Sequence, residues 1–193
     1  MQVTFKPVLW IWLAGPFFEL GVRALFQQLG PNPQEALLRG LGQQTLVLLL
    51  LVVAMPFLAR WLVPSILVFR RMVGLFAFFY ASIHLLAFWV FEHGLVLSDL
   101  LHDALTRPFV AVGLGSLALL APLALTSNRF SMRRLGPRWK LLHRLIWPAL
   151  GFGILHYALH KSGKNDFDGP LLAAAVLLVV VLTRPNRAGA RTG

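Results

Sequence analysis

Two kinds of residue are scarce in this chain: it has no cysteine, and charged side chains make up only 13% of its 193 residues. The missing cysteine excludes disulfides, iron–sulfur clusters and thiolate metal sites. Hydrophobic residues reach 58% of the chain. That composition is too apolar for a soluble domain and indicates a protein that crosses a membrane several times.

Acidic residues are also few, seven against 18 Lys and Arg, which gives a net charge of +11. Such an excess can indicate nucleic-acid binding, but basic cytoplasmic loops explain it more simply in a membrane protein. The sequence carries no dinucleotide-binding fingerprint. Its length suits one compact bundle without an additional soluble catalytic domain, so we treat 1–193 as a single transmembrane domain.

Long apolar runs predict an all-α integral membrane protein with six transmembrane helices. The first run lacks a clear cleavage site, so we interpret it as a retained helix and not as a signal peptide. The sixth is short. The predicted spans are 7–26, 43–63, 71–91, 108–126, 141–160 and 168–183.

The distribution of charge predicts the orientation of these spans. With both termini on the same side, thirteen Lys and Arg residues fall on that side and five on the other, which places both termini in the cytoplasm. Six of the seven acidic residues fall on the outer side. The segment 96–105 has the pattern of a short amphipathic helix at the outer interface.

Two histidines lie deep inside apolar spans, His84 in the third and His156 in the fifth. These spans run in the same direction, and both imidazoles come at a similar depth in the outer half of the bilayer. A pair of this kind can hold one haem between two axial nitrogens. The alternatives are two structural histidines bonded to backbone or serine, or a proton or metal relay in a transporter. A relay would predict further acidic residues inside the spans, and only Glu19 is there.

His143 precedes His156 by 13 residues, a helical rise of about 20 Å that suits two stacked redox centres. Thirteen residues at about 100° each turn the two side chains about 140° apart on a straight helix. Pro148, with Gly151 and Gly153 nearby, could kink the helix and reduce that angle.

Arg70 precedes His84 by 14 residues and shares its helix face, but a guanidinium stays protonated and is a poor iron ligand. It would pair with a haem propionate or a lipid phosphate. His160 lies one turn beyond His156 and is either the true ligand or a solvated residue at the helix end. We expect His93 and His102 at the outer surface.

Several short segments together resemble one known family. They are Arg70–Leu75, Ala81–Leu85, Leu105–Phe109, Leu125–Ser127, Leu135–His143 and Ile154–Tyr157. From about residue 43 onward the chain resembles the MsrQ (YedZ-like) family, the haem-binding membrane subunits of the bacterial protein-methionine-sulfoxide reductase system. That family is similar in its core to the transmembrane domains of ferric reductases and NADPH oxidases.

The resemblance implies that His84 and His156 are axial ligands of an outer b-type haem and that His143 belongs to an inner site, which could hold a second haem. Arg70 stands where oxidases have a fourth histidine, a departure that MsrQ proteins share. Arg107 is a candidate anion contact at the outer rim, although a snorkelling arginine would look the same.

The resemblance further implies an electron-transfer subunit of the bacterial inner membrane, distinct from the catalytic subunit. Electrons would come from a cytoplasmic flavin reductase or from quinol, with flavin mononucleotide as an associated cofactor. They would pass to a periplasmic molybdenum-cofactor subunit that reduces methionine sulfoxide.

Overall fold

The computed structural model describes residues 2–61, 63–162 and 165–183, and this part of the chain is helical with short connections. In chain order its elements are α1 (Gln2–Leu25), α2 (Pro33–Trp61), the 3-10 helix η1 (Pro64–Phe69), α3 (Arg70–His93), α4 (Leu97–Thr106), α5 (Pro108–Leu125), α6 (Arg129–Leu135), α7 (Pro137–Leu142), the 3-10 helix η2 (His143–Leu145), α8 (Ile146–Ser162) and α9 (Asp168–Leu182). The predicted all-helical fold class is confirmed.

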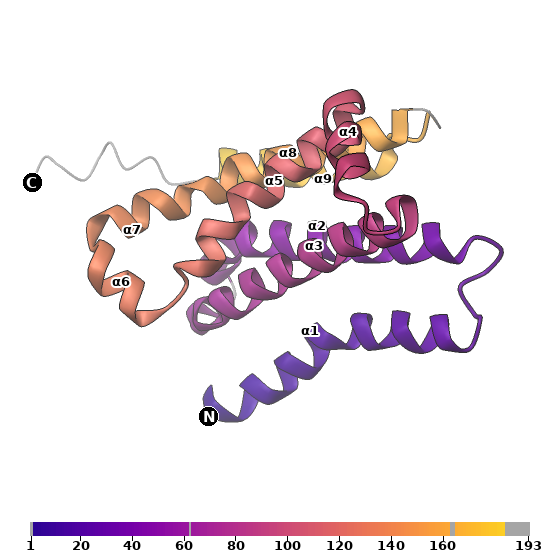
Figure 1. Cartoon of the computed structure of the whole chain (residues 1–193). Coiled ribbons are helices and arrows are strands. Elements are labelled where there is room, and N and C mark those ends of the chain that lie inside the picture. Colours follow the sequence, from indigo (N-terminus) through magenta and orange to yellow (C-terminus); the bar gives the residue numbers. More distant parts are fainter. Residues whose placement is uncertain (1, 62, 163–164, 184–193) are drawn as a thin grey trace, which may run out of the picture.

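The long helices form a bundle made of two closely packed pairs, α2 with α3 and α5 with α8 (Figure 1). Helix α9 packs against α2 and α8, and α1 lies along the outside of α2 and α3. Helices α3 and α8 run in the same direction, from the end of the bundle near α6 and α7 toward the end where α4 lies (Figure 1). The expected amphipathic segment 96–105 forms α4, with Leu100 buried.

Four helices in the described ranges are long and apolar enough to cross a membrane: α1 from Phe5, α2, η1 with α3, and α5. Helix α9 is apolar but has only 15 residues, and α8 has 17. Large apolar side chains are exposed along α1 and α9, as expected for surfaces that face lipid. The chain is therefore a multi-pass membrane protein, and the count of six spans stays a prediction. Lys164 and the basic C-terminal tail, used in the charge count, lie outside the described residues.

Helix α2 begins ten residues before the predicted start of the second span at 43. Pro33 takes the first helical position, where its missing N–H is not needed. The Asn32 side chain caps this end, because its Oδ1 accepts from the Glu35 N–H at 3.3 Å and its Nδ2 donates to the Glu35 carboxylate at 3.1 Å. The prediction missed the first ten residues of this helix because it searched for long apolar runs, and these residues include several polar side chains.

The fifth span differs from the prediction in a way that matters for His143. The interval 141–160 was expected to be one helix, but α7 ends at Leu142, η2 follows, and α8 begins at Ile146. Pro148 explains the break: it has no N–H for the carbonyl of Arg144, and its ring would clash with that carbonyl in a continuous helix. Pro148 therefore sits in the first turn of α8, and the irregularity expected from Pro148 takes the form of the 3-10 segment His143–Leu145 just before it.

Tyr80 joins α1 to α3 through a proline-containing turn of α1. Its hydroxyl accepts from the N–H of Phe17 at 3.0 Å and donates to the carbonyl of Leu13 at 2.8 Å. These two backbone groups would bond each other in a regular helix, and Pro16 lies between them. The fully buried hydroxyl is thus inserted into the α1 ladder.

Replacing Tyr80 with Phe should lower the free energy of unfolding by about 1–3 kcal/mol, because two buried backbone groups lose their partner. Thermal unfolding in detergent measures this. Ser82→Ala is the matched control, since the Ser82 hydroxyl bonds only the Phe78 carbonyl of its own helix. Equal stability of the Tyr80→Phe variant and the control would contradict the role of the hydroxyl.

Candidate functional site

A cavity of about 480 Å³ opens between α2, α3, α5 and α8. Its inner part is lined by leucines of α2 and α5, among them Leu46, Leu49, Leu117 and Leu120. Its other end is polar and lies where α2 and α5 begin and α3 and α8 finish. Polar residues at this end are Asn32, Gln34, Glu35, Arg39, Glu92, Arg107, His160 and Lys161, while Gln43, Thr45, Ser116 and Tyr157 also contribute to the lining. The cavity is therefore amphiphilic, with an apolar floor and a charged mouth.

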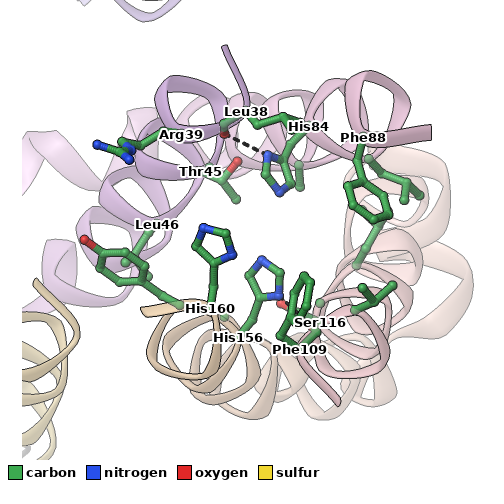
Figure 2. Close-up of a pocket in the computed structure, with 18 of the residues that line it drawn as sticks. Leu38, Arg39, Thr45, Leu46, His84, Phe88, Phe109, Ser116, His156 and His160 are labelled. Atoms are coloured by element: carbon green, nitrogen blue, oxygen red, sulfur yellow. Dashed lines mark hydrogen bonds between the residues drawn. The ribbon is translucent and has the colours of Figure 1, made fainter. Parts of the chain in front are cut away.

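His84 projects into this cavity from α3 (Figure 2). Its Nδ1 lies 3.0 Å from the carbonyl oxygen of Leu38 on α2, so the Nδ1–H donates to that carbonyl. Gly42 makes the approach possible, because a methyl group there would lie 3.3 Å from Cε1 of the ring. The bond selects the tautomer whose Nε2 carries the lone pair.

His156 is held in the same way from the opposite wall (Figure 2). Its Nδ1 lies 2.7 Å from the carbonyl oxygen of Phe109 on α5 and donates to it. A methyl group on Gly113 would lie only 2.7 Å from that Nδ1. Each ring therefore sits against a carbonyl of the neighbouring helix, with a glycine four residues further along that helix.

The two rings face each other with centres 6.1 Å apart and planes at 83°. With a metal–imidazole bond of about 2 Å and about 1 Å from nitrogen to ring centre, two rings that share one metal have centres about 6 Å apart. The predicted pair thus comes together at the separation that axial ligation requires.

His160 points into the same cavity from one turn further along α8, at its exposed mouth (Figure 2). Its ring lies 5.7 Å from that of Phe109. Within the described ranges no three His, Asp or Glu side chains are placed to hold a bare metal ion. Two imidazoles on opposite walls suit a planar group that supplies its own equatorial donors.

His143 and Arg70 do not line this cavity. The His143 Nδ1–H donates to the Trp139 carbonyl at 3.1 Å, and the His143 ring stacks on the Trp139 ring with centres 3.8 Å apart. Arg70 is the first residue of α3 and lies at the same end of the bundle (Figure 1). Both residues lie at the end of the bundle away from the cavity mouth, and Arg70 is about 20 Å along α3 from His84.

We expected His93 at the surface, and this prediction is wrong, because its side chain is only 9% exposed. Its Nε2 lies 3.2 Å from Oδ2 of the buried Asp103 on α4, without hydrogen-bond alignment. Arg107 Nε lies 3.2 Å from Oδ1 of the same carboxylate. The fold of α4 back over the end of α3 encloses His93, whereas His102 is exposed as predicted.

Four residues that hold the two histidine rings in place were not predicted from the sequence. Leu38 and Phe109 act through their carbonyls, and any residue type supplies a carbonyl. Gly42 and Gly113 act through the absence of a side chain. In each helix the glycine follows the residue with the accepting carbonyl by four positions. This spacing could have indicated the two carbonyls only if it had been known which helices pack against each other.

Comparison with known proteins identifies the family of this chain. The ferric reductase like transmembrane component family matches residues 40–154, which include His84 and His143 and end just before His156. No solved structure matches the chain.

Three relatives carry the name protein-methionine-sulfoxide reductase heme-binding subunit MsrQ. The protein of Herminiimonas arsenicoxydans is 40% identical over 185 residues, covering 93% of this chain and 83% of the relative. That of Polaromonas naphthalenivorans is 38% identical, covering 91% and 81%. That of Bordetella pertussis is 42% identical, covering 91% and 86%. With this identity over nearly its whole length, the chain belongs to the MsrQ family of ferric reductase-like transmembrane proteins.

Proposed function

We propose that this chain is a membrane electron-transfer subunit that binds one b-type haem between His84 and His156. The observation that carries the proposal is the pair of imidazoles, each fixed through Nδ1 to a backbone carbonyl and 6.1 Å apart across a cavity with an apolar floor. The names of the MsrQ relatives support the same ligand. Binding would be non-covalent, because the sequence has no cysteine for a thioether link.

Haem in this cavity would supply one-electron chemistry within the membrane. The chain's own part is to present two Nε2 lone pairs, to fix both ring orientations and to exclude water with the surrounding leucines. We propose a cytoplasmic flavin reductase, with flavin mononucleotide, or membrane quinol as the electron donor. The acceptor would be a periplasmic molybdenum-cofactor subunit that reduces methionine sulfoxide, so this chain is not itself the catalytic subunit.

For the end of the bundle that carries His143 and Arg70, we propose a more limited role. His143 and Arg70 would take part in electron entry from the donor side, because both lie at the end of the bundle away from the cavity mouth. His143 would bind a second haem only if Trp139 moved off its ring, because the two rings are stacked 3.8 Å apart. Arg70 would then pair with a carboxylate of that haem and would not ligate its iron.

His84→Ala and His156→Ala should each abolish haem binding at the cavity, because each removes one of two axial nitrogens. The pyridine haemochrome assay per mole of purified protein, together with the visible spectrum, measures this loss. His143→Ala should leave the spectrum of this haem intact.

His160→Ala is the matched control for the ligand assignment, since His160 lies on the same helix and in the same cavity. It should retain haem and the spectrum of two axial imidazoles. If His160→Ala loses haem while His156→Ala keeps it, the axial ligand lies one turn further out. A colourless wild-type protein would contradict the proposal as a whole and favour a transporter.

Gly113→Ala should speed haem loss by about 10–100-fold, the usual range for damage to the partner of a metal-bound histidine. The new methyl group would displace the His156 ring from the Phe109 carbonyl. Transfer of haem to apomyoglobin gives the rate. Gly151→Ala is the control, because a methyl group there meets nothing within 4 Å. Equal rates in the two variants would argue against the steric role of Gly113.

We also propose that the chain lies in the bacterial inner membrane with both termini in the cytoplasm. A reporter fused after Gly193 should then be active as a cytoplasmic fusion, and one inserted after Asp166, between α8 and α9, as a periplasmic fusion. The reverse pattern would place the cavity mouth on the cytoplasmic side and invert the proposed direction of electron flow.

A further inference from the structure

The two histidines do not account for the charged residues at the mouth of the cavity. Haem carries two carboxylates on one edge, and a carboxylate buried in a membrane is stable only beside a cation or hydrogen-bond donors. The inner part of this cavity is lined largely by leucines, whereas the mouth carries three cations, Arg39, Arg107 and Lys161, and two acids, Glu35 and Glu92. A group with one charged edge would therefore enter with that edge at the mouth.

Arg107 differs from the other two cations in how it is held. Arg39 pairs with Glu35 and Lys161 with Asp166, and these two carboxylates have side-chain exposures of 37% and 48%. Arg107 instead forms an ion pair with Asp103, whose side chain is only 8% exposed. A buried partner fixes an arginine side chain far better than an exposed one, because exposed pairs are weak and mobile.

The buried Asp103 carboxylate has a neighbour at each oxygen, within 3.2 Å in both cases. His93, at the end of α3, lies against Oδ2, and Arg107 lies against Oδ1 through its Nε. A guanidinium held through Nε still has its Nη donors for a second anion. The Arg107 side chain is 52% exposed and lines the cavity, so those donors are accessible at the mouth.

We propose that Arg107 binds the haem carboxylates at the cavity mouth, and that Asp103 is the residue that positions it. The inference rests on the proposed function, because it assumes haem between His84 and His156. It assigns to the His93–Asp103–Arg107 group the orientation of the haem, with its charged edge toward α4.

The test compares haem with haem dimethyl ester, which has the same ring and iron but no carboxylate charge. The full-length apoprotein in detergent is reconstituted with each, and the rate of loss to apomyoglobin is measured. Wild type should hold haem at least about tenfold longer than the ester, the worth of one charge-assisted hydrogen bond. Arg107→Gln should shorten the lifetime of haem alone and abolish that preference, and Arg107→Lys should keep only part of it.

Asp103→Asn separates positioning from simple electrostatics. Removing a negative charge should by itself favour the haem carboxylates, whereas loss of positioning should weaken their binding. We expect the preference for haem to fall. If this variant does not fold, His93→Gln keeps both charges and should lower the preference by a smaller factor. Arg23→Gln is the control, because Arg23 also pairs with an acid four residues earlier but lies on α1, away from the cavity.

Equal retention of haem and ester by wild type, with two-imidazole spectra for both, would overturn this inference and leave the proposed function standing. A greater preference for haem in Asp103→Asn would overturn the positioning role. If wild type binds neither compound, the proposed function fails and the inference fails with it.

Discussion

The structure depends on one constraint: an imidazole inside an apolar bundle must have a hydrogen-bond partner for each nitrogen. His84 and His156 each give Nδ1–H to a carbonyl of the neighbouring helix. In an α-helix that carbonyl also receives the N–H four residues on, and here those residues are Gly42 and Gly113. The missing side chains let each ring reach a carbonyl that the helix already uses. The second nitrogen of each ring, Nε2, is therefore left to bind a group in the cavity.

The packing of the bundle follows from this requirement. A carbonyl of α2 accepts from the histidine of α3, and a carbonyl of α5 accepts from the histidine of α8. The two most closely packed helix pairs are therefore the pairs joined by these hydrogen bonds. Small residues keep the second pair close: the hydroxyl of Ser116 on α5 donates to the Ala149 carbonyl of α8 at 2.8 Å, and Gly115 lies against Phe152. Helices α3 and α8 run in the same direction (Figure 1). Their two rings reach the same part of the cavity, with centres 6.1 Å apart.

The sequence was enough to predict the parts of the site that depend on polarity alone. An ionisable ring in a long apolar run is conspicuous, and the depth of His84 and His156 predicted their pairing. The sequence was not enough to predict the parts of the fold and the site that depend on backbone geometry. The polar start of α2, which carries Leu38, resembled a loop because apolar length was the criterion. The break before α8 depends on the register of Pro148, and the burial of His93 depends on α4 folding over it, a tertiary contact that no local pattern records.

The most direct test of the central claim is the electron paramagnetic resonance spectrum of the oxidised, haem-loaded protein. Two axial imidazoles make ferric haem low-spin, and the angle between their planes sets the anisotropy of the signal. With the planes near perpendicular, at 83°, the account predicts a strongly anisotropic low-spin signal with one dominant feature at low field. A high-spin signal would contradict ligation by both His84 and His156. A three-line rhombic signal of nearly parallel rings would contradict the ring orientations that the Leu38 and Phe109 carbonyls impose.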